Sequence, residues 1–399
     1  MPEAAPLTRP IMAGIVTALV GFTSSFAVVL TGLAAVGASP AQAASGLLAA
    51  STTMGLACVV LAWRYRMPIT VAWSTPGAAL LAATGAAGAP DDSAGQWPAA
   101  VGAFLLTALL ILLTALWPAL GALIARIPPS IAQAMLAGVL LPLCLAPITG
   151  LIENPLGVVP VVITWLVFAR LAPRWAVPAA FVAASVVVAI SLTTVGSRVD
   201  PALLLPRVDL TAPAFTASAA IGIALPLFIV TMASQNVPGV AIMRSFDYEV
   251  PWRPAMLVTG IGTAMGATAG GHAINLAAIS AALAASPDAD PDPKRRWVAG
   301  VSTGVSYLVL GGCSAAFAAL VLLAPQSVIP AVAGVALFAA FGSAVQQAID
   351  ETDDRIPAVV TFLVAASGIS LLGVSGAFWS LVAGLLVRAV LRAGRSARA

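Results

Sequence analysis

Charged side chains are scarce in this sequence. Of its 399 residues, 60% are hydrophobic and only 8% are charged. Soluble globular proteins carry about 25% charged residues, because a folded chain needs them to cover its surface. The composition therefore excludes a soluble enzyme, a nucleic-acid binder and a disordered protein. It indicates a polytopic membrane protein.

Cysteine and histidine are also rare. Cys58, Cys144 and Cys313 stand alone in apolar runs, and His272 is the one histidine. This pattern predicts neither a metal site nor a disulfide framework. The sequence has no HExxH motif, no pair of carboxylates expected at mid-membrane depth and no Ser/His or Ser/Lys arrangement. We therefore expect no enzyme activity and no cofactor.

Long charge-free runs predict membrane-spanning helices, each of which needs about 20 apolar residues. The runs 10–63, 297–349 and 356–387 are each long enough to hold two spans. The expected breaks share turn-forming residues and lie near 37–40, 325–327 and 373–376. Together with the shorter runs they give about fourteen segments of an all-α polytopic membrane protein.

The basic residues predict the orientation. If the N-terminus is cytoplasmic and the segments alternate, every Lys and Arg except Arg198 and Arg207 falls on the cytoplasmic side. That is the positive-inside pattern. We therefore expect both termini in the cytoplasm.

The chain also resembles itself. The Pro-Pro-Ser-Ile of 128–131 matches the Pro-Gln-Ser-Val of 325–328, and Trp97 has a counterpart in Trp297. These matches predict two halves, 1–200 and 201–399, of about seven segments each. Because seven is odd, the second half enters the membrane from the opposite face, as in the inverted repeats of transporters.

Residues 67–86 are too irregular to cross the bilayer as one helix. Positions 69–73 are mostly β-branched or aromatic and follow a proline, which favours an extended stretch. Ser74 or Thr75 can then cap a helix that has Pro76 at its first position. The sequence predicts a short strand followed by a half-helix of about 10 residues, ~15 Å long, which is too short to cross the bilayer.

Residues 266–285 repeat this plan of strand and half-helix, with paired glycines that loosen the backbone. We expect the second half-helix to run from about 273 to 285, with His272 at its start. In an inverted repeat the two half-helix N-termini point at each other, and each carries free N–H groups and about half a positive charge. A small anion or a polar acceptor group would bind there.

Aromatic and uncharged polar side chains near these breaks are the candidate substrate-binding residues. They are Phe22, Thr23, Ser24, Ser25, Phe26, Trp73, Ser74, Thr75, Ser234, Gln235, Asn236, Gly271, His272 and Asn275. The two phenylalanines fit a pocket wall, and equally a core or lipid-facing position. Asn275 would share a helix face with His272. Serine and threonine in membrane helices often bond their own backbone, so a structural role for 23–25 stays open.

No carboxylate is expected at the membrane midplane, so His272 is the one group there that titrates near neutral pH. We hypothesise that a proton accompanies the anion, either on His272 or on the acid itself. The alternative is a neutral histidine that only caps or packs.

Four motifs spread over the chain resemble the benzoate/proton symporter family of bacteria. They are Gly-Phe-Thr-Ser-Ser (21–25), Pro-Ile-Thr-Val-Ala-Trp-Ser-Thr-Pro-Gly (68–77), Ser-Gln-Asn-Val-Pro-Gly (234–239) and Gly-Gly-His-Ala-Ile-Asn-Leu-Ala-Ala-Ile (270–279). That family is similar to the uracil-permease type of fold. The resemblance implies a core domain of segments 1–4 and 8–11, a gate domain of segments 5–7 and 12–14, and substrate between segments 3 and 10.

The resemblance further implies a secondary active transporter in the bacterial inner membrane. It would import benzoate or a similar aromatic carboxylate with a proton by alternating access. Where related nucleobase permeases carry glutamates, this chain has Ser234 or Gln235, and His272, which argues against a nucleobase and suits an anion. Expected partners are benzoate, a proton and the lipid bilayer, with no metal, no nucleic acid and a homodimer as one option.

Two other functions stay open on the residues alone. One is a passive anion channel or uniporter, although the segments at 128–149 and 328–349 are very apolar for a continuous polar path. The other is a carrier of another small organic anion.

Overall fold

The computed structural model describes residues 7–86, 93–117, 120, 126–195, 204–278, 280–371 and 374–396, and most of them are helical. Within these ranges, eight helices are long and apolar enough to cross a membrane. The number is nine if the bent pair at 293–312 and 314–323 counts as one span. These helices agree with the polytopic membrane protein that the composition predicts.

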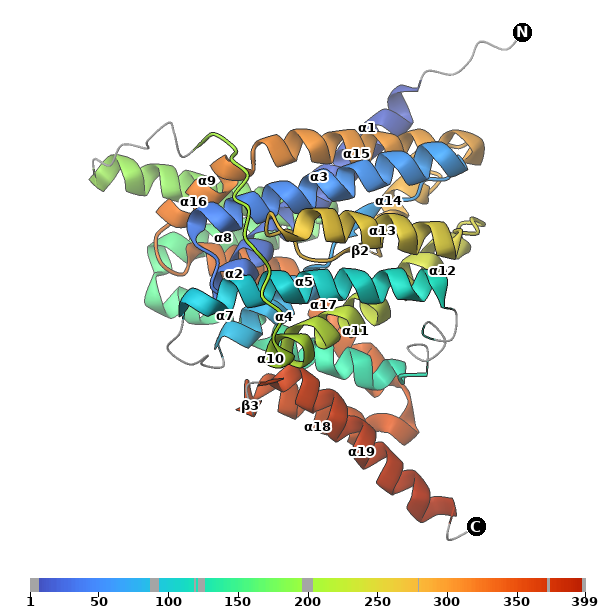
Figure 1. Cartoon of the computed structure of the whole chain (residues 1–399). Helices are drawn as coiled ribbons and strands as arrows, with labels where there is room; N and C mark the ends of the chain where they lie inside the picture. Colours follow the sequence, from blue (N-terminus) through green and yellow to red (C-terminus); the bar gives the residue numbers. More distant parts are fainter. Residues whose placement is uncertain are drawn as a thin grey trace.

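The first half of the chain is helical with one short strand (Figure 1). Its elements are α1 (Thr8–Thr23), α2 (Phe26–Ala35), α3 (Pro40–Tyr65), β1 (Val71–Trp73), α4 (Thr75–Ala86), α5 (Ser93–Leu116), α7 (Pro129–Glu153), α8 (Pro155–Leu171), the 3-10 turn η1 (Pro173–Trp175) and α9 (Ala176–Val195). The break expected before Pro40 is confirmed. There the Ser39 hydroxyl accepts a hydrogen bond from the Gln42 N–H at 3.3 Å.

The second half begins with a helix that contains two π-helical turns. Its elements are α10 (Ala217–Ala219), η3 (Ala220–Ala224), α11 (Leu225–Thr231), η4 (Met232–Asn236), α12 (Val237–Ser245), α13 (Trp252–Ala267), β2 (Ile274–Leu276), α14 (Ala281–Ala285), η5 (Pro293–Arg295), α15 (Trp297–Gly312), α16 (Ser314–Leu323), α17 (Val328–Asp350), η6 (Thr352–Asp354), α18 (Arg355–Ala366), β3 (Ser370–Leu371), β4 (Val374–Ser375) and α19 (Gly376–Ser396). The break expected at 325–327 is confirmed. The part of the break expected at 373–376 that falls on residue 373 lies outside the described residues.

The two short strands β1 and β2 pair with each other in the middle of the helices. They run antiparallel, with Ala72 opposite Asn275 and Trp73 opposite Ile274. The pairing continues beyond the strands, since the Ser74 N–H donates to the Ala273 carbonyl at 2.8 Å. Segments from the two halves of the chain therefore form one small ribbon.

Side chains from neighbouring helices bond the outer edges of this ribbon. The Cys58 thiol sulfur accepts a hydrogen bond from the backbone N–H of the first β1 residue at 3.0 Å. On β2, the Thr263 hydroxyl accepts from the Ile274 N–H at 3.1 Å. The Asn236 side-chain oxygen accepts from the Leu276 N–H at 2.9 Å. Irregular backbone at membrane depth needs such partners, because hydrocarbon offers none.

The expected second half-helix is wrong in its start and its length. The strand β2 occupies 274–276, and α14 does not begin until Ala281. His272 therefore precedes a strand, and Asn275 lies within it, so the two do not share a helix face. The physical reason is the pairing with β1, which gives residues 274–276 the extended conformation. The local sequence does not predict this pairing, because β1 is distant along the chain.

Long helices pack around the ribbon in recurring pairs. In Figure 1, α3, α5, α13 and α15 lie side by side, and contacts join α3 to α15, α3 to α13 and α5 to α13. A second set contains α7 packed on α17 and α18, α8 packed on α9 and α17, and α18 packed on α19. Buried Asp354 ties this second set together, because it accepts hydrogen bonds from Arg388 (2.8 Å) and Ser130 (3.3 Å).

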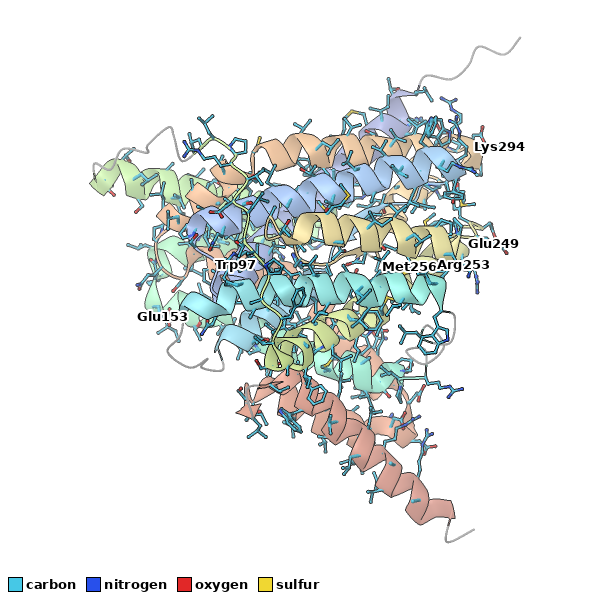
Figure 2. All side chains as sticks on the ribbon, viewed as in Figure 1. Trp97, Glu153, Glu249, Arg253, Met256 and Lys294 are labelled. Carbon is cyan, nitrogen blue, oxygen red and sulfur yellow. The ribbon has the colours of Figure 1, made fainter. Side chains whose placement is uncertain are left out.

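Charged residues mark the two ends of the helix bundle. Figure 2 shows Glu249, Arg253 and Lys294 at one end and Glu153 at the other. Loops expected on opposite sides of the membrane thus lie at opposite ends of the molecule, as alternating spans require.

Candidate substrate site

A cavity of about 340 Å³ lies beside the ribbon. One wall comes from α1, the α1–α2 break, α3, β1, the start of α4, η4, the residues after β2, and α15. The facing wall comes from α7, η1, α9 and α17. Its volume falls within the ~300–1,000 Å³ of small-molecule sites.

Five of the predicted site residues line this cavity: Ser24, Ser25, Trp73, Thr75 and Gln235. Both serine hydroxyls donate to a backbone carbonyl of the preceding helical turn, at 2.9 and 3.2 Å. The Ser25 oxygen also accepts a hydrogen bond of 2.8 Å from the Trp73 indole N–H. The helix break and the strand β1 are thereby fixed to each other at the cavity wall.

Ser74 caps α4, as the sequence predicts. Its hydroxyl oxygen accepts from the Gly77 N–H at 3.1 Å and from the Thr231 hydroxyl at 2.8 Å. Its backbone carbonyl lies 3.2 Å from the Nε2 atom of His272. Ser74 therefore positions the helix start and does not itself line the cavity.

The N-terminus of α4 offers few free donors. Pro76 has no N–H, and the Gly77 N–H is already bonded to Ser74. At most the Thr75 N–H, among the first three helical residues, can face a bound group. Because α14 spans only five residues, the expected pair of opposed half-helices is reduced to α4 alone. A bound anion would rely chiefly on side chains.

His272 and Asn275 are buried behind the cavity wall. Since His272 Nε2 faces a carbonyl, we assign the ring hydrogen to Nε2, and Nδ1 has no hydrogen-bond partner among the described residues. The Asn275 amide donates to the Leu276 carbonyl at 2.8 Å, and its Oδ1 likewise lacks a partner there. Two unsatisfied buried acceptors on one ribbon are unusual, because each costs about 1–3 kcal/mol.

Phe22 and Phe26 lie in an aromatic cluster that supports the cavity from behind. Both are fully buried, and neither lines the cavity. The Phe22 ring centroid lies 5.1 Å from that of Trp73 and 4.8 Å from that of Phe317. Phe26 lies 4.8 Å from Phe181. Of the two alternatives left open by the sequence, the structure places both rings in the core.

The other predicted residues bond the backbone. The Thr23 and Ser234 hydroxyls donate to carbonyls four residues earlier, at 2.7 and 2.5 Å. The Gly271 N–H donates to a backbone carbonyl at 2.9 Å. None of these, nor Asn236 on the ribbon edge, lines the cavity.

Several lining residues are not among those that the sequence predicts. Tyr307 on α15 is 1% exposed and lines the cavity, as does Ser280. A Cβ atom at Gly21 would lie 2.5 Å from the Tyr307 hydroxyl, so glycine leaves the space that Tyr307 fills. A tyrosine alone in a long apolar run was the available signal. The small residues Ala336, Ala339 and Ala340 of α17 gave no signal.

The lining is mostly apolar with a few hydroxyls, one carboxamide and one charge. Arg174 of η1 is the single charged residue among the described lining residues. No cluster of three or more His, Cys, Asp or Glu that would suit a metal occurs in the described chain. Such a wall suits a small molecule with a flat apolar body and a polar end.

A helical membrane bundle interrupted by short irregular segments beside a cavity is typical of membrane transporters. Residues 6–390 match the family described as BenE, benzoate membrane transport protein, and the chain belongs to that family. The family is one of membrane transporters and not of enzymes.

Two curated relatives span nearly the whole chain. Inner membrane protein YdcO of Escherichia coli is 36% identical over 96% of this chain and 95% of its own length. The benzoate membrane transport protein of Acinetobacter baylyi is 29% identical over 95% of this chain and 94% of its own. Multiple apolar helices and the first relative's name agree with a place in a membrane.

Solved structures share the fold at low identity. The transmembrane domain of the cyanobacterial bicarbonate transporter BicA superposes with a TM-score of 0.62 at 17% identity, covering 95% of this chain and 97% of that one. The anion transporter Slc26a9 from mouse gives 0.61 at 13% identity, covering 99% and 70%. These likenesses establish the fold alone.

Proposed function

We propose that this protein is a secondary active transporter of the bacterial inner membrane that imports benzoate or a similar aromatic carboxylate with a proton. The observation that carries the proposal is the cavity beside the β1–β2 ribbon, which has hydroxyls and a carboxamide on the ribbon side and a facing wall that is apolar apart from Arg174. Membership of the benzoate transport family and the Acinetobacter relative's name support this substrate class.

The lining suggests how such an anion binds. Its carboxylate would accept hydrogen bonds from the Thr75 hydroxyl and the Gln235 amide, which lie on the ribbon side. Its ring would lie among Trp73, Leu140 of α7 and Leu337 of α17. Burying an ionised carboxylate is costly where no cation is fixed in the centre of the cavity. Binding of a proton together with the carboxylate is therefore favoured.

We further propose fourteen segments in two inverted repeats, 1–200 and 201–399. The packing supports this, because most helix pairs have a counterpart in the other half. In such a repeat the counterparts are α3 and α13, α5 and α15, α7 and α17, α8 and α18, α9 and α19, and β1 and β2. Replacing each helix by its counterpart turns the contact α3–α15 into α5–α13, α8–α17 into α7–α18, and α8–α9 into α18–α19, and all of these contacts occur. The contacts β1–β2 and α7–α17 each join an element to its own counterpart, as expected at a pseudo-two-fold axis.

In this proposal the core holds segments 1–4 and 8–11, and the gate holds segments 5–7 and 12–14. The cavity would then lie between core and gate, since α7, α9 and α17 face the ribbon across it. Movement of one against the other would expose the cavity to each side in turn, with both termini in the cytoplasm. His272, whose Nδ1 acceptor is unpartnered among the described residues, is the proposed proton carrier.

The test is uptake of radiolabelled benzoate into proteoliposomes with and without an inward proton gradient. We expect accumulation above the equilibrium level that a protonophore abolishes. Counterflow driven by internal unlabelled benzoate should also occur, as it does for a carrier. Flux that only equilibrates and shows no counterflow would establish a channel. Absence of benzoate flux, with counterflow of another organic anion, would overturn the substrate.

A further inference from the structure

A second cavity of about 290 Å³ adjoins the substrate cavity. It lies among α1, η1, α14 and the loop that follows α14. Its lining residues are Arg9, Met12, Ala13, Val16, Arg174, Leu283, Ser286, Asp288 and Ala289. Arg174 and Leu283 line both cavities, so the two spaces share a boundary.

The second cavity has an excess of positive charge. Arg9 and Arg174 face one carboxylate, that of Asp288, among its lining residues. Arg174 Nη2 lies 3.7 Å from Asp288 Oδ2, and the two side chains are 61% and 78% exposed. The pair is longer than a charge-assisted hydrogen bond, which is about 2.7–2.9 Å, and ion pairs this exposed contribute little to stability. A carboxylate that enters the cavity can therefore displace Asp288 from Arg174.

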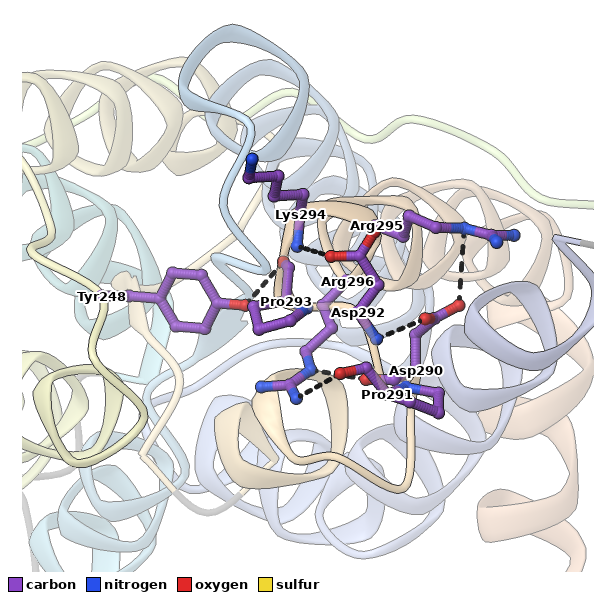
Figure 3. A network of polar contacts seen from close by, with 8 residues as sticks. All are labelled: Tyr248, Asp290, Pro291, Asp292, Pro293, Lys294, Arg295 and Arg296. Carbon is purple, nitrogen blue, oxygen red and sulfur yellow. Dashed lines mark hydrogen bonds and ion pairs between the residues drawn. The ribbon is translucent and has the colours of Figure 1, made fainter. Parts of the chain in front are cut away.

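The chain on either side of Asp288 is held by hydrogen bonds and an ion pair, and Figure 3 shows those that involve residues 290–296. Arg296 is buried, and its guanidinium donates to the Asp290 carbonyl at 2.7 Å and to the Ala285 carbonyl at 2.9 Å. Arg295 forms an ion pair with the Asp290 side chain at 3.7 Å. Asp288 is thus fixed to the end of α14, on the ribbon side of the molecule, while Arg174 belongs to η1 on the facing side. The Arg174–Asp288 pair bridges the two proposed domains.

We propose that the second cavity is a further binding site for the carboxylate of an aromatic acid. We call it the outer site because it lies between the substrate cavity and the solvent, and the name does not refer to the extracellular side of the membrane. Arg174 and Arg9 bind the carboxylate, and the apolar side chains Met12, Val16 and Leu283 contact the ring. Asp288 competes with the ligand for Arg174. This inference rests on the proposed function for its ligand class, and it adds a site that the anion occupies between the substrate cavity and the solvent.

The test uses a reporter thiol and needs no transport. In detergent-purified full-length protein with Cys313→Ala, the exposed native thiol is removed. Ser286→Cys then places a thiol in the outer site. Its modification by an anionic and by a cationic methanethiosulfonate is timed by mass spectrometry. If Ser286→Cys does not yield folded protein, Met12→Cys serves as the reporter.

The proposal predicts opposite effects of two charge-removing variants. Arg174→Gln should lower the ratio of anionic to cationic rates by about two- to fivefold, the range of an exposed charge pair. Asp288→Asn should raise it by a similar factor, because Arg174 is then free. Benzoate should protect the thiol, and neutral benzamide should not. The control Arg355→Gln, on α18 away from the outer site, should leave the ratio unchanged.

Two outcomes would overturn the outer site. One is a ratio that moves in the same direction in Arg174→Gln and Asp288→Asn, as for a purely structural ion pair. The other is equal protection by benzoate and benzamide, or none. Because these readouts are independent of flux, a protein that binds benzoate here without transporting it would refute the proposed function alone.

Discussion

The indole N–H of Trp73 donates a 2.8 Å hydrogen bond to the hydroxyl of Ser25. One residue ends β1, and the other lies in the break between α1 and α2. Both line the substrate cavity. The bond therefore holds two irregular pieces of backbone, from different segments, in one cavity wall.

Removing this bond while keeping an aromatic ring should weaken substrate binding. We expect Trp73→Phe to lower benzoate affinity about fivefold, equivalent to the ~1 kcal/mol of a neutral hydrogen bond. Equilibrium binding of labelled benzoate measures this. Trp379→Phe is the control, because it also loses an indole hydrogen bond, to the Leu371 carbonyl, but lies away from the cavity. Equal losses in both variants would contradict a specific role for the Trp73–Ser25 bond.

Gln235 provides the one carboxamide in the described cavity lining. Gln235→Leu preserves size and removes both donors, so a bound carboxylate loses a hydrogen bond worth about 1–3 kcal/mol. We expect the KM for benzoate uptake to rise at least fivefold. Gln347→Leu, on an exposed part of α17, should leave KM unchanged. An unchanged KM in Gln235→Leu would place the carboxylate elsewhere.

Gly21 and Tyr307 should be coupled by contact. The added methyl of Gly21→Ala would lie 2.5 Å from the Tyr307 hydroxyl oxygen. Overpacking of this kind costs about 1–3 kcal/mol. We expect a lower melting temperature and reduced uptake.

The second substitution Tyr307→Phe removes the clashing oxygen. We expect the double variant to recover most of the stability lost in Gly21→Ala, as measured by the melting temperature in detergent. Gly312→Ala is the control, since nothing lies within 4 Å of its added methyl. Additive losses in the double variant would show that the two residues are not coupled.

His272→Gln tests the proton route. If His272 carries the coupled proton, this variant should still equilibrate benzoate and perform counterflow. It should lose the accumulation that a proton gradient drives in the wild type. Uptake at a series of external pH values measures the effect. A pH dependence equal to that of the wild type would exclude His272 and leave the protonated acid as the transported form.

Asp354 should make stability depend on pH. Burial alone would raise the pKa of its carboxyl group. The hydrogen bond and charge of Arg388, the charge of Arg392 and the hydrogen bond from Ser130 outweigh burial and hold the pKa below its usual value. A lowered pKa in the folded state stabilises the fold at neutral pH. That contribution is lost as pH falls through the folded-state pKa.

Asp354→Asn should therefore be less stable than the wild type at neutral pH by about 1–3 kcal/mol, the worth of hydrogen bonds to a charged group. The difference in melting temperature should stay constant from ~pH 7 down to ~pH 5, and it should shrink as the pH falls below ~4, the usual pKa of an aspartate, toward the lower pKa of the folded state. Glu351→Gln, an exposed carboxylate nearby, is the control. A difference that stays constant with pH would contradict this account.

The first broken segment was predictable because its signals are local. A proline, β-branched residues and then Ser74 with Pro76 predict strand, cap and half-helix in that order, and the structure confirms each. The second broken segment has no such cap. Its strand at 274–276 depends on β1, which is distant in sequence, so the local pattern suggested helix instead.

Only part of the candidate site could be predicted from such local signals. Ser24, Ser25, Trp73, Thr75 and Gln235 line the cavity, and each lies at or beside an irregular piece of backbone. Phe22 and Phe26 belong to the core because aromatic side chains from α9, α16 and β1 pack against them, which periodicity cannot reveal. Tyr307 and Arg174 reach the cavity through tertiary packing alone.

The ribbon has a consequence for biogenesis. Ser74 and His272 are in contact although they are 198 residues apart in the sequence. While the first half is being inserted, the backbone of β1 has no strand to pair with, and lipid cannot replace it. Until the second half is made, residues 71–73 of the nascent chain must therefore stay in contact with water, with the translocation machinery or with neighbouring helices, which can bond their backbone. Substitutions at Cys58, which bonds β1 from within the same half, should accordingly reduce the yield of inserted protein more than the activity of the molecules that mature.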